Sequence, residues 1–138
     1  MIPSQMLKGI LQGCVLAIIG QRETYGYEIS QALAQRGFGD ISEGTIYPLL
    51  LRLEKGGMIS ARLLASDLGP KRKYYTITDQ GRQTLAEFRI NYQELRAAVD
   101  RLPGFNKEDS YESKDQGTVE REQSTGESPF PGESGSAD

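Results

Sequence analysis

Two short segments hold the side chains whose types and spacing suit the binding of a polyanion. The segment from Ser42 to Tyr47 precedes a run of leucines, and Lys71-Arg72-Lys73 precedes two tyrosines. Hydroxyl groups and free backbone N–H groups at the start of a helix suit phosphate oxygens and base edges, and clustered Lys and Arg neutralise phosphates without reading sequence. Each segment also has an ordinary explanation, because Ser is a common helix cap and basic residues in a turn are commonly just solvated. Together the two segments indicate a nucleic acid as the partner.

We expect nine residues to contact double-stranded DNA. Most of them belong to the first turn of one helix, and Arg52 lies further along that helix, off its apolar face. The basic segment, Lys71-Arg72-Lys73, would contact mainly phosphates. The expected DNA-binding residues are Ser42, Glu43, Gly44, Thr45, Tyr47, Arg52, Lys71, Arg72 and Lys73. For Tyr47 two interpretations stay open, a contact with phosphate or sugar and a contact with the protein itself.

The side chains that most enzymes need are missing from this sequence. It has no histidine and one cysteine, Cys14, which excludes histidine-based catalysis and metal sites, internal disulfides and cysteine clusters. Cys14 lies in an apolar stripe, which favours a small core residue over a reactive thiol. No glycine-rich phosphate loop or paired carboxylate is evident. We therefore expect neither an enzyme nor a bound metal or cofactor.

The overall charge argues at first against a nucleic-acid partner, because the 138 residues carry a net charge of −3 and the sequence pI is about 5.1. The charge is unevenly distributed, however. Residues 1–104 hold 13 Lys and Arg against 10 Asp and Glu, a net charge of +3, whereas residues 105–138 hold 3 against 9, a net charge of −6. The second stretch is rich in Glu, Ser and Gly, which predicts a disordered acidic tail behind a mildly basic folded part.

No segment is apolar enough to span a membrane. The longest apolar run, from Cys14 to Ile19, is far shorter than the roughly 18 to 20 residues that a membrane helix needs. The first four residues lack the basic start of a secretory signal. We expect a cytoplasmic protein without a membrane partner.

Apolar residues at helical spacing predict two N-terminal helices that would support the polar segments. The first follows Ser4 as its N-cap and stops at Gly20. The second runs from Thr24 to Arg36 and is ended by Gly37. The expected inward face of the second helix consists of Ile29, Ala32 and Leu33. In its first turn, Gly26 would let another backbone or a ligand approach closely.

The third helix carries the first polar segment. Ser42 is the expected N-cap, with Ile41 and Ile46 as a hydrophobic staple around it. The buried stripe is expected to consist of Ile46, Leu49, Leu50 and Leu53. Pro48 conflicts with a start at Ser42, because a proline beyond the first turn removes a backbone hydrogen bond. Either the helix is kinked or it starts later, and we favour a start near Gly44.

A β-hairpin is expected to carry the second polar segment. Residues 59–63 alternate apolar and polar side chains, and residues 73–77 are rich in β-branched and aromatic side chains. The expected turn between them places Lys71, Arg72 and Lys73 at the tip, with Arg62 nearby on the opposing strand. Three helices followed by a basic hairpin predict a winged helix-turn-helix, in which the last helix of the pair enters the major groove.

The final helix is expected to mediate dimerisation. Thr78 would cap it, and its apolar residues are spaced alternately by three and four positions, as in a short coiled-coil seam. A narrow seam on a lone helix needs a surface to pack against, which either a partner subunit or the chain's own core would supply. The expected interface consists of Leu7, Leu11, Leu85, Phe88, Tyr92, Leu95, Val99 and Leu102.

The resulting fold class is mainly α with a small β-hairpin, a winged helix-turn-helix followed by a C-terminal dimerisation helix. We expect a DNA-binding domain in residues 1–78, the dimerisation helix in residues 79–104 and the tail in residues 105–138. The quoted motifs resemble the PadR family of bacterial transcriptional regulators. The resemblance spans roughly residues 5–102 and rests on five blocks, taken in order: Tyr25-Gly26-Tyr27-Glu28-Ile29, Ser42-Glu43-Gly44-Thr45-Ile46-Tyr47-Pro48-Leu49-Leu50, Arg52-Leu53-Glu54, Gly57-Met58-Ile59 and Lys71-Arg72-Lys73-Tyr74-Tyr75-Thr76-Ile77-Thr78-Asp79-Gln80-Gly81.

The resemblance implies a homodimeric repressor that binds a pseudo-palindromic operator. The single C-terminal helix is similar to the short subgroup of the family, which implies relief of DNA binding by a small aromatic or hydrophobic effector. The chain has no tryptophan, the residue that members of this subgroup use to bind flat aromatic drugs. Phe88 and Tyr92 either line a pocket between subunits or fill the core. The alternative function is a protein-interaction module that has lost DNA binding.

Overall fold

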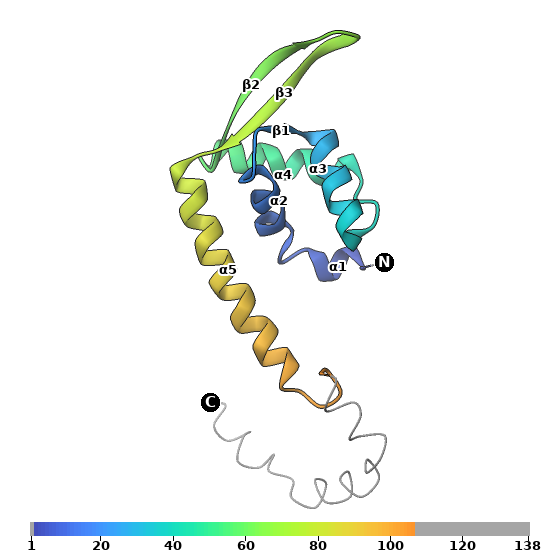
Figure 1. Cartoon of the computed structure of the whole chain (residues 1–138), viewed down its shortest axis with the longest axis vertical. Coiled ribbons are helices and arrows are strands. Elements are labelled where there is room, and N and C mark those ends of the chain that lie inside the picture. Colours follow the sequence, from blue (N-terminus) through green and yellow to red (C-terminus); the bar gives the residue numbers. More distant parts are fainter. Residues whose placement is uncertain (1, 107–138) are drawn as a thin grey trace, which may run out of the picture. The chain divides into compact units, whose positions relative to one another are not determined.

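Four helical segments and a small sheet precede one long helix in the computed structural model, which describes residues 2–106. Figure 1 shows the helical segments gathered below the sheet, from which the β2–β3 hairpin projects. The described residues form two compact units, one up to Tyr92 and one from Gln93 onward. The helices are α1 (Ser4–Leu7), α2 (Leu11–Ile19), α3 (Gly26–Leu33), α4 (Glu43–Lys55) and α5 (Asp79–Asp100). The strands are β1 (Thr24–Tyr25), β2 (Ile59–Ser66) and β3 (Gly69–Ile77).

The core of the N-terminal unit is formed where α2, α3 and α4 meet the base of the sheet. The predicted stripe of α4 is confirmed, since Ile46, Leu49, Leu50 and Leu53 are all buried. On α3, Ile29 and Leu33 are buried and Ala32 is partly buried. Other buried members of this core are Leu11, Val15, Leu16, Ile19, Ile59, Tyr75, Ile77 and Leu85.

The first predicted helix is wrong in one respect, because it is two helices. A turn at Lys8, Gly9 and Ile10 separates α1 from α2, and the Ile10 amide donates to the Leu7 carbonyl at 2.9 Å. Ser4 is inside α1 and not its N-cap. Glycine weakens a helix interior, which explains why the chain turns here. The expected stop is confirmed, with Gly20 directly after α2.

The second predicted helix begins two residues too early. Thr24 and Tyr25 form the short strand β1, which pairs antiparallel with Tyr75 and Tyr74 of β3. The sheet order is therefore β1-β3-β2. Helix α3 continues into a short π-helical turn, η1 (Ala34–Phe38), in which Gly37 has a φ of 95°. Only glycine adopts such a φ readily, so the prediction that Gly37 ends this helix is confirmed.

Helix α4 begins at Glu43, so the favoured later start near Gly44 is wrong and Ser42 occupies the N-cap position. The Ser42 side chain makes no capping hydrogen bond; its hydroxyl lies 3.2 Å from the Thr45 hydroxyl. Pro48 lies inside the helix and leaves the Gly44 carbonyl without its usual donor. Both residues are exposed, so water can take the place of the missing hydrogen bond.

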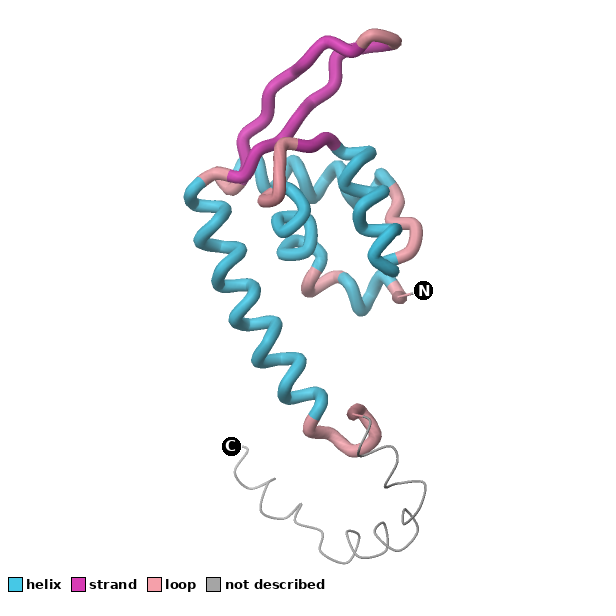
Figure 2. Tube along the Cα trace, viewed as in Figure 1, coloured by secondary structure: helices cyan, strands magenta, loops and turns pink. Residues whose placement is uncertain are grey.

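The hairpin is longer than predicted. Its strands pair from Ile59 with Ile77 out to Ser66 with Gly69, and the turn at its far end consists of Asp67 and Leu68 (Figure 2). Lys71, Arg72 and Lys73 therefore lie within β3 and not at the tip, which corrects the prediction. The outer half of the hairpin has no buried residue, since only Leu64 and Ser66 are partly covered, and its sequence lacks the apolar alternation from which strands are predicted.

The start of α5 is hydrogen-bonded to the turn after α4. As predicted, Thr78 caps the helix, because its hydroxyl accepts from the Gly81 amide at 3.0 Å and donates to the Gly57 carbonyl at 2.7 Å. The Thr78 amide donates to the Met58 carbonyl at 3.1 Å. Gly81 is buried against that same carbonyl, so closely that a Cβ atom at this position would overlap it.

Replacing Gly81 by alanine should destabilise the fold because the added methyl group collides with backbone, which cannot move aside as a side chain can. We expect a loss of roughly 2–3 kcal/mol in the free energy of unfolding, measured by urea denaturation. Gly9→Ala is the matched control, since nothing lies within 4 Å of the Cβ that it would add. Equal stability of the two variants would contradict this account of the junction.

A surface ion pair supports the edge of the sheet. Arg62 of β2 donates from both Nε and Nη2 to the Glu23 carboxylate, at 2.7 Å each, and holds the pKa of Glu23 below its ordinary value. A lowered carboxyl pKa means stabilisation that is present above the ordinary value of 4.5 and lost as the pH falls through the lowered one.

Arg62→Gln should therefore be slightly less stable than the wild type at neutral pH, and the difference should shrink as the pH falls below about 4.5. The urea midpoints of the wild type and the variant at about pH 7 and about pH 3 measure the difference in stability at each pH. Arg22→Gln is the control, because it removes a positive charge from an exposed side chain next to Glu23 in the sequence. Its stability relative to the wild type should not change with pH in this way. A deficit that persists unchanged at low pH would show that Arg62 acts through packing.

Candidate nucleic-acid interface

The predicted contact residues of α4 lie together on its exposed side. Ser42, Glu43, Gly44 and Thr45 are all exposed, directly before the buried Ile46. The first backbone N–H groups of a helix have no partner within the helix, and the helix dipole places partial positive charge there. Small side chains leave these groups accessible to phosphate, while the Glu43 carboxylate can accept from the amino group of cytosine. This first turn can therefore position a backbone and read a base edge.

Tyr47 contacts the protein and is also partly exposed, so its interpretation as a protein contact is confirmed, while a contact with phosphate or sugar stays a prediction. Its ring lies over Gly26, where an added Cβ would come within 2.8 Å of the ring. The close approach predicted at Gly26 is thus made by a side chain, and not by a backbone or ligand. Tyr47 still exposes 46% of its surface. Helix α3 therefore holds the ring of Tyr47 in place beside the first turn of α4.

The three basic residues of β3 differ in what they contact. The Lys73 ammonium donates to Glu54 of α4 at 2.8 Å, which raises the pKa of Lys73 and keeps it charged. The Arg72 guanidinium lies over the ring of Tyr25 on β1, 4.6 Å from its centroid. Lys71 is exposed and, within residues 2–106, makes no ion pair. Lys71 is therefore the cation of this strand that is most available to a phosphate.

The two arginines nearest to these elements also behave differently. Arg52 is exposed on α4 and has no carboxylate partner in the described part of the chain. Arg62, which the sequence placed beside the basic segment, is instead paired with Glu23. Sequence reasoning missed the carboxylates Glu23 and Glu54 as partners of the basic residues. Nothing local could have revealed them, because they are 39 and 19 positions away along the chain.

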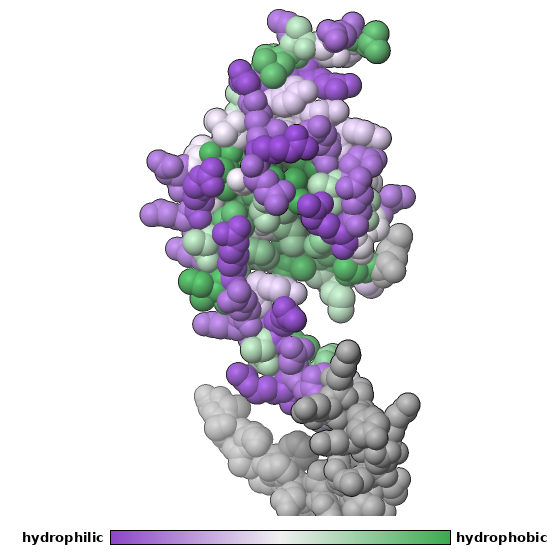
Figure 3. Space-filling model, viewed as in Figure 1, coloured by the Kyte–Doolittle hydropathy of each residue, from purple (hydrophilic) through white to green (hydrophobic). Residues whose placement is uncertain are grey.

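The far end of the hairpin exposes apolar side chains among hydrophilic ones, as Figure 3 shows, which the sequence reasoning also missed. Leu68 in the turn is 96% exposed and Leu63 on β2 is 61% exposed. A hairpin that carries Lys71 and Arg72 along one strand and leucine at its end offers both phosphate contacts and an apolar contact.

The predicted dimer residues fall into two groups. Leu7, Leu11 and Leu85 are buried within their own chain, and Phe88 lies half-buried over Gly13. Tyr92, Leu95 and Leu102 expose 41–53% of their surface, and Val99 is partly exposed. A partner can therefore reach the second group directly, whereas the first group already contributes to the fold of one subunit.

Catalytic chemistry has no support in the described residues. Cys14 is half-buried, and burial raises the pKa of its thiol, which favours the unreactive protonated form. Residues 2–106 contain no cluster of His, Cys, Asp and Glu able to hold a metal ion, and no helix among them is long and apolar enough to cross a membrane. The predicted acidic tail lies outside the described residues, apart from its first two positions.

Comparison with known proteins identifies the relatives of this chain. Residues 15–87 match the model of the transcriptional regulator PadR-like family. The solved structure of a PadR-like transcriptional regulator from Bacillus cereus is 54% identical, with a TM-score of 0.63 over 70% of this chain and 93% of that one. An uncharacterised protein of Lysinibacillus sphaericus is 36% identical over 102 residues, which cover 72% of this chain and 94% of the relative.

A more distant relative is the negative transcriptional regulator PadR of Bacillus subtilis. It is 28% identical over 92 residues, which are 65% of this chain and 50% of that protein. Its structure in complex with operator DNA has a TM-score of 0.54 to this one, at 29% identity over 59% of this chain and 47% of that one. The long family match and the extended identity to full-length relatives lead to one conclusion: this chain is a winged-helix protein of the PadR-like family of transcriptional regulators, and not an enzyme.

Proposed function

We propose that this regulator is a homodimeric repressor that binds double-stranded DNA through α4 and β3. The observation that carries the proposal is the division of α4 into a buried stripe and an exposed polar first turn. In this proposal Ser42, Glu43, Gly44, Thr45 and Tyr47 meet the major groove, with Arg52 further along the helix. Lys71 and Arg72 of β3 contact phosphates. Lys73 also contacts a phosphate, after its ion pair with Glu54 breaks.

Repression and the DNA partner are supported by a relative. The Bacillus subtilis protein is named a negative transcriptional regulator and has been solved with operator DNA, and its fold resembles that of this chain. A regulator that acts on DNA also belongs where the DNA is, which agrees with the cytoplasmic location that we expect. The similarity spans only about half of that relative, so its regulated gene and signal are not carried over.

The homodimer is supported by the apolar residues of α5 and the turn after it. Leu95 and Leu102 each expose about half of their surface to solvent, 53% and 50%. Within α5, Tyr92, Leu95 and Val99 are spaced three and four residues apart and are at least partly exposed, which is typical of a seam between two helices. In a two-fold dimer, the two α4 helices would occupy successive major grooves about 34–36 Å apart, which matches a pseudo-palindromic operator.

An effector that relieves DNA binding is the last part of the proposal. The rings of Phe88 and Tyr92 stack with their centroids 6.1 Å apart, and Tyr92 is partly exposed. Such a surface suits a small aromatic or hydrophobic molecule at the interface between subunits. The single helix after the hairpin agrees with the short subgroup of the family.

A protein-interaction module is the second candidate. It is favoured by the carboxylates that neutralise Arg62 and Lys73, two of the basic residues near the hairpin. A polarisation assay with duplex DNA from upstream of the chain's own gene, at about 100 mM salt, separates the two functions. Saturable binding above that of random DNA supports the repressor, and binding no better than random DNA favours the module.

The double substitution Lys71→Ala and Arg72→Ala should weaken binding to every DNA sequence. Two lost phosphate contacts lower the slope of log affinity against log salt by about 0.9 each. Polarisation at several salt concentrations measures the slope. Arg82→Ala with Arg89→Ala removes the same charge from exposed positions of α5 and is the control. If the control loses as much slope as the β3 variant, the hairpin does not make these contacts.

Leu95→Glu should dissociate the dimer, because it places a charge in an apolar seam on both subunits. Losing about 1.5–3 kcal/mol of apolar burial per subunit raises the dissociation constant roughly 100-fold or more. Analytical ultracentrifugation measures the change. Gln93→Glu adds the same charge at an exposed polar position of α5 and should leave the dimer intact. A Leu95→Glu protein that remains dimeric would place the interface elsewhere.

A further inference from the structure

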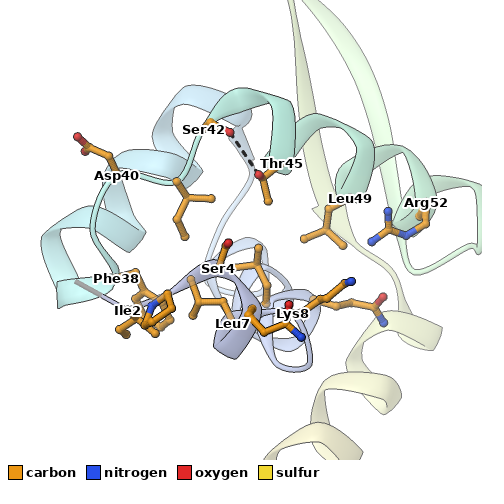
Figure 4. A pocket seen from close by; sticks show the side chains of 15 residues that line it. Ile2, Ser4, Leu7, Lys8, Phe38, Asp40, Ser42, Thr45, Leu49 and Arg52 are labelled. Atoms are coloured by element: carbon orange, nitrogen blue, oxygen red, sulfur yellow. Dashed lines mark hydrogen bonds between the residues drawn. The ribbon is translucent and has the colours of Figure 1, made fainter.

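A cavity of about 660 Å³ lies beside α4 within the N-terminal unit. Its walls come from α1, α2, the segment between η1 and α4, and α4 itself (Figure 4). The volume falls in the range of small-molecule sites, which is about 300–1,000 Å³. Leu7 and Leu11 in these walls are also among the predicted dimer residues, whereas Phe88 and Tyr92, the two rings proposed above to meet an effector, do not line the cavity.

The apolar part of the cavity is aliphatic in character. Leu7, Leu11 and Leu49 line it, and Phe38 contributes one aromatic ring. In Figure 4 the side chains of Leu7 and Leu49 lie on opposite sides of the open space. A ligand body made of several CH₂ groups would bury its apolar surface against these side chains.

The charged groups of the cavity favour an anion. Lys8 and Arg52 line it together with one carboxylate, Asp40, so cations outnumber anions. Arg52 and Asp40 lie at opposite ends of the cavity in Figure 4. Neither Lys8 nor Arg52 has an ion-pair partner within residues 2–106. Their charges are therefore available to a ligand.

The cavity shares residues with the DNA surface. Ser42, Thr45 and Arg52 line the cavity and are also among the expected DNA contacts. A molecule bound here would occupy the inner side of the same helical turn and neutralise Arg52. Binding of that molecule and binding of DNA would then oppose each other, and by thermodynamic linkage each would weaken the other by the same factor.

We propose that this cavity is the binding site for an amphipathic organic anion, an aliphatic chain that ends in a carboxylate, whose binding opposes DNA binding at α4. The chain lies against Leu7, Leu11 and Leu49, and the carboxylate meets Lys8 and Arg52. The opposition to DNA rests on the function proposed above, whereas binding of the anion itself does not.

Three probes with the same chain test the chemistry: octanoate and octylamine, each below the concentration at which it forms micelles, and octanol below its solubility limit. Titration into the full-length ¹⁵N-labelled protein reports affinity and location through the backbone amide signals. We expect octanoate to shift the signals of cavity residues in a saturable way and to bind about threefold to tenfold more tightly than octanol, because its charge meets two cations. Octylamine should bind most weakly. Octylamine binding as tightly as octanoate, or shifts outside the cavity, would overturn the proposal.

Variants locate the charge interaction and the cavity. Lys8→Gln and Arg52→Gln should each weaken octanoate about threefold to fivefold and leave octanol unchanged. Lys55→Gln is the control, since it removes a cation from α4 outside the cavity. Gln12→Trp, at an exposed position on the cavity wall, should fill the space and abolish binding of all the probes. Unchanged octanoate affinity in Gln12→Trp would show that the ligand binds elsewhere and would overturn the proposal.

Sedimentation of Gln12→Trp shows whether a second copy of the chain, and not a small anion, fills the cavity. If this variant becomes monomeric and the wild type binds no probe, the proposal is overturned.

Fluorescence polarisation with the upstream duplex, with and without saturating octanoate, tests the opposition between the anion and DNA. We expect octanoate to lower DNA affinity at least about fivefold. Saturable octanoate binding by a protein that binds no DNA would refute the repressor function and leave the anion site standing. Unchanged DNA affinity at saturation would refute the opposition between the two ligands.

Discussion

The burial of one face of α4 determines which of its side chains point to the solvent and are available to bind DNA. Ile46, Leu49, Leu50 and Leu53 are at most 3% exposed, and α4 packs against α3 and β2. Rotating the helix would expose these four side chains, at a cost of about 1.5–3 kcal/mol each. One hydrogen bond to a phosphate contributes at most about 1.5–3 kcal/mol, less than the four side chains together, so the protein core sets the orientation of the helix before DNA arrives. The polar first turn therefore faces outward because the core requires it, and the proposed DNA contacts depend on that direction.

The second constraint is the close junction between the end of α4, the base of the hairpin and the start of α5. Thr78 hydrogen-bonds to Gly57 and Gly81, and Gly81 has no side chain to separate the helix from Met58. These contacts fix the base of the hairpin to α4 and α5. Further out on β3, the Lys73 ammonium donates to Glu54 of α4. An ion pair between exposed groups contributes little to stability, so a phosphate can displace it at low cost. The position of β3 relative to α4 thus rests on buried contacts, whereas its cations remain available.

Most of the helices were predictable because their apolar residues repeat at helical spacing and end at glycines, as at Gly20 and Gly37. The cap at Thr78 was predictable for the same local reason. The two-residue strand β1 was not, since it exists only through pairing with β3 some fifty residues later. The outer half of the hairpin lacks a buried face, so no alternation marks its strands and the basic residues appeared to lie at a tip. Of the site, the polar turn of α4 follows from sequence, but the partners of Lys73, Arg72 and Tyr47 come from elements distant in the chain. Sequence shows which cations exist, and only the fold shows which of them are already paired.

We propose that the first turn of α4 and the basic residues of β3 form one DNA-binding surface. Backbone amide signals of the ¹⁵N-labelled protein, followed as a duplex from upstream of its own gene is added, test it most directly. We expect the largest changes at residues 42–47, 69 and 71–73, on two elements that are distant in sequence, and we expect their signals to titrate with one affinity. Changes confined to α5, or changes on β3 alone with no response from α4, would contradict it.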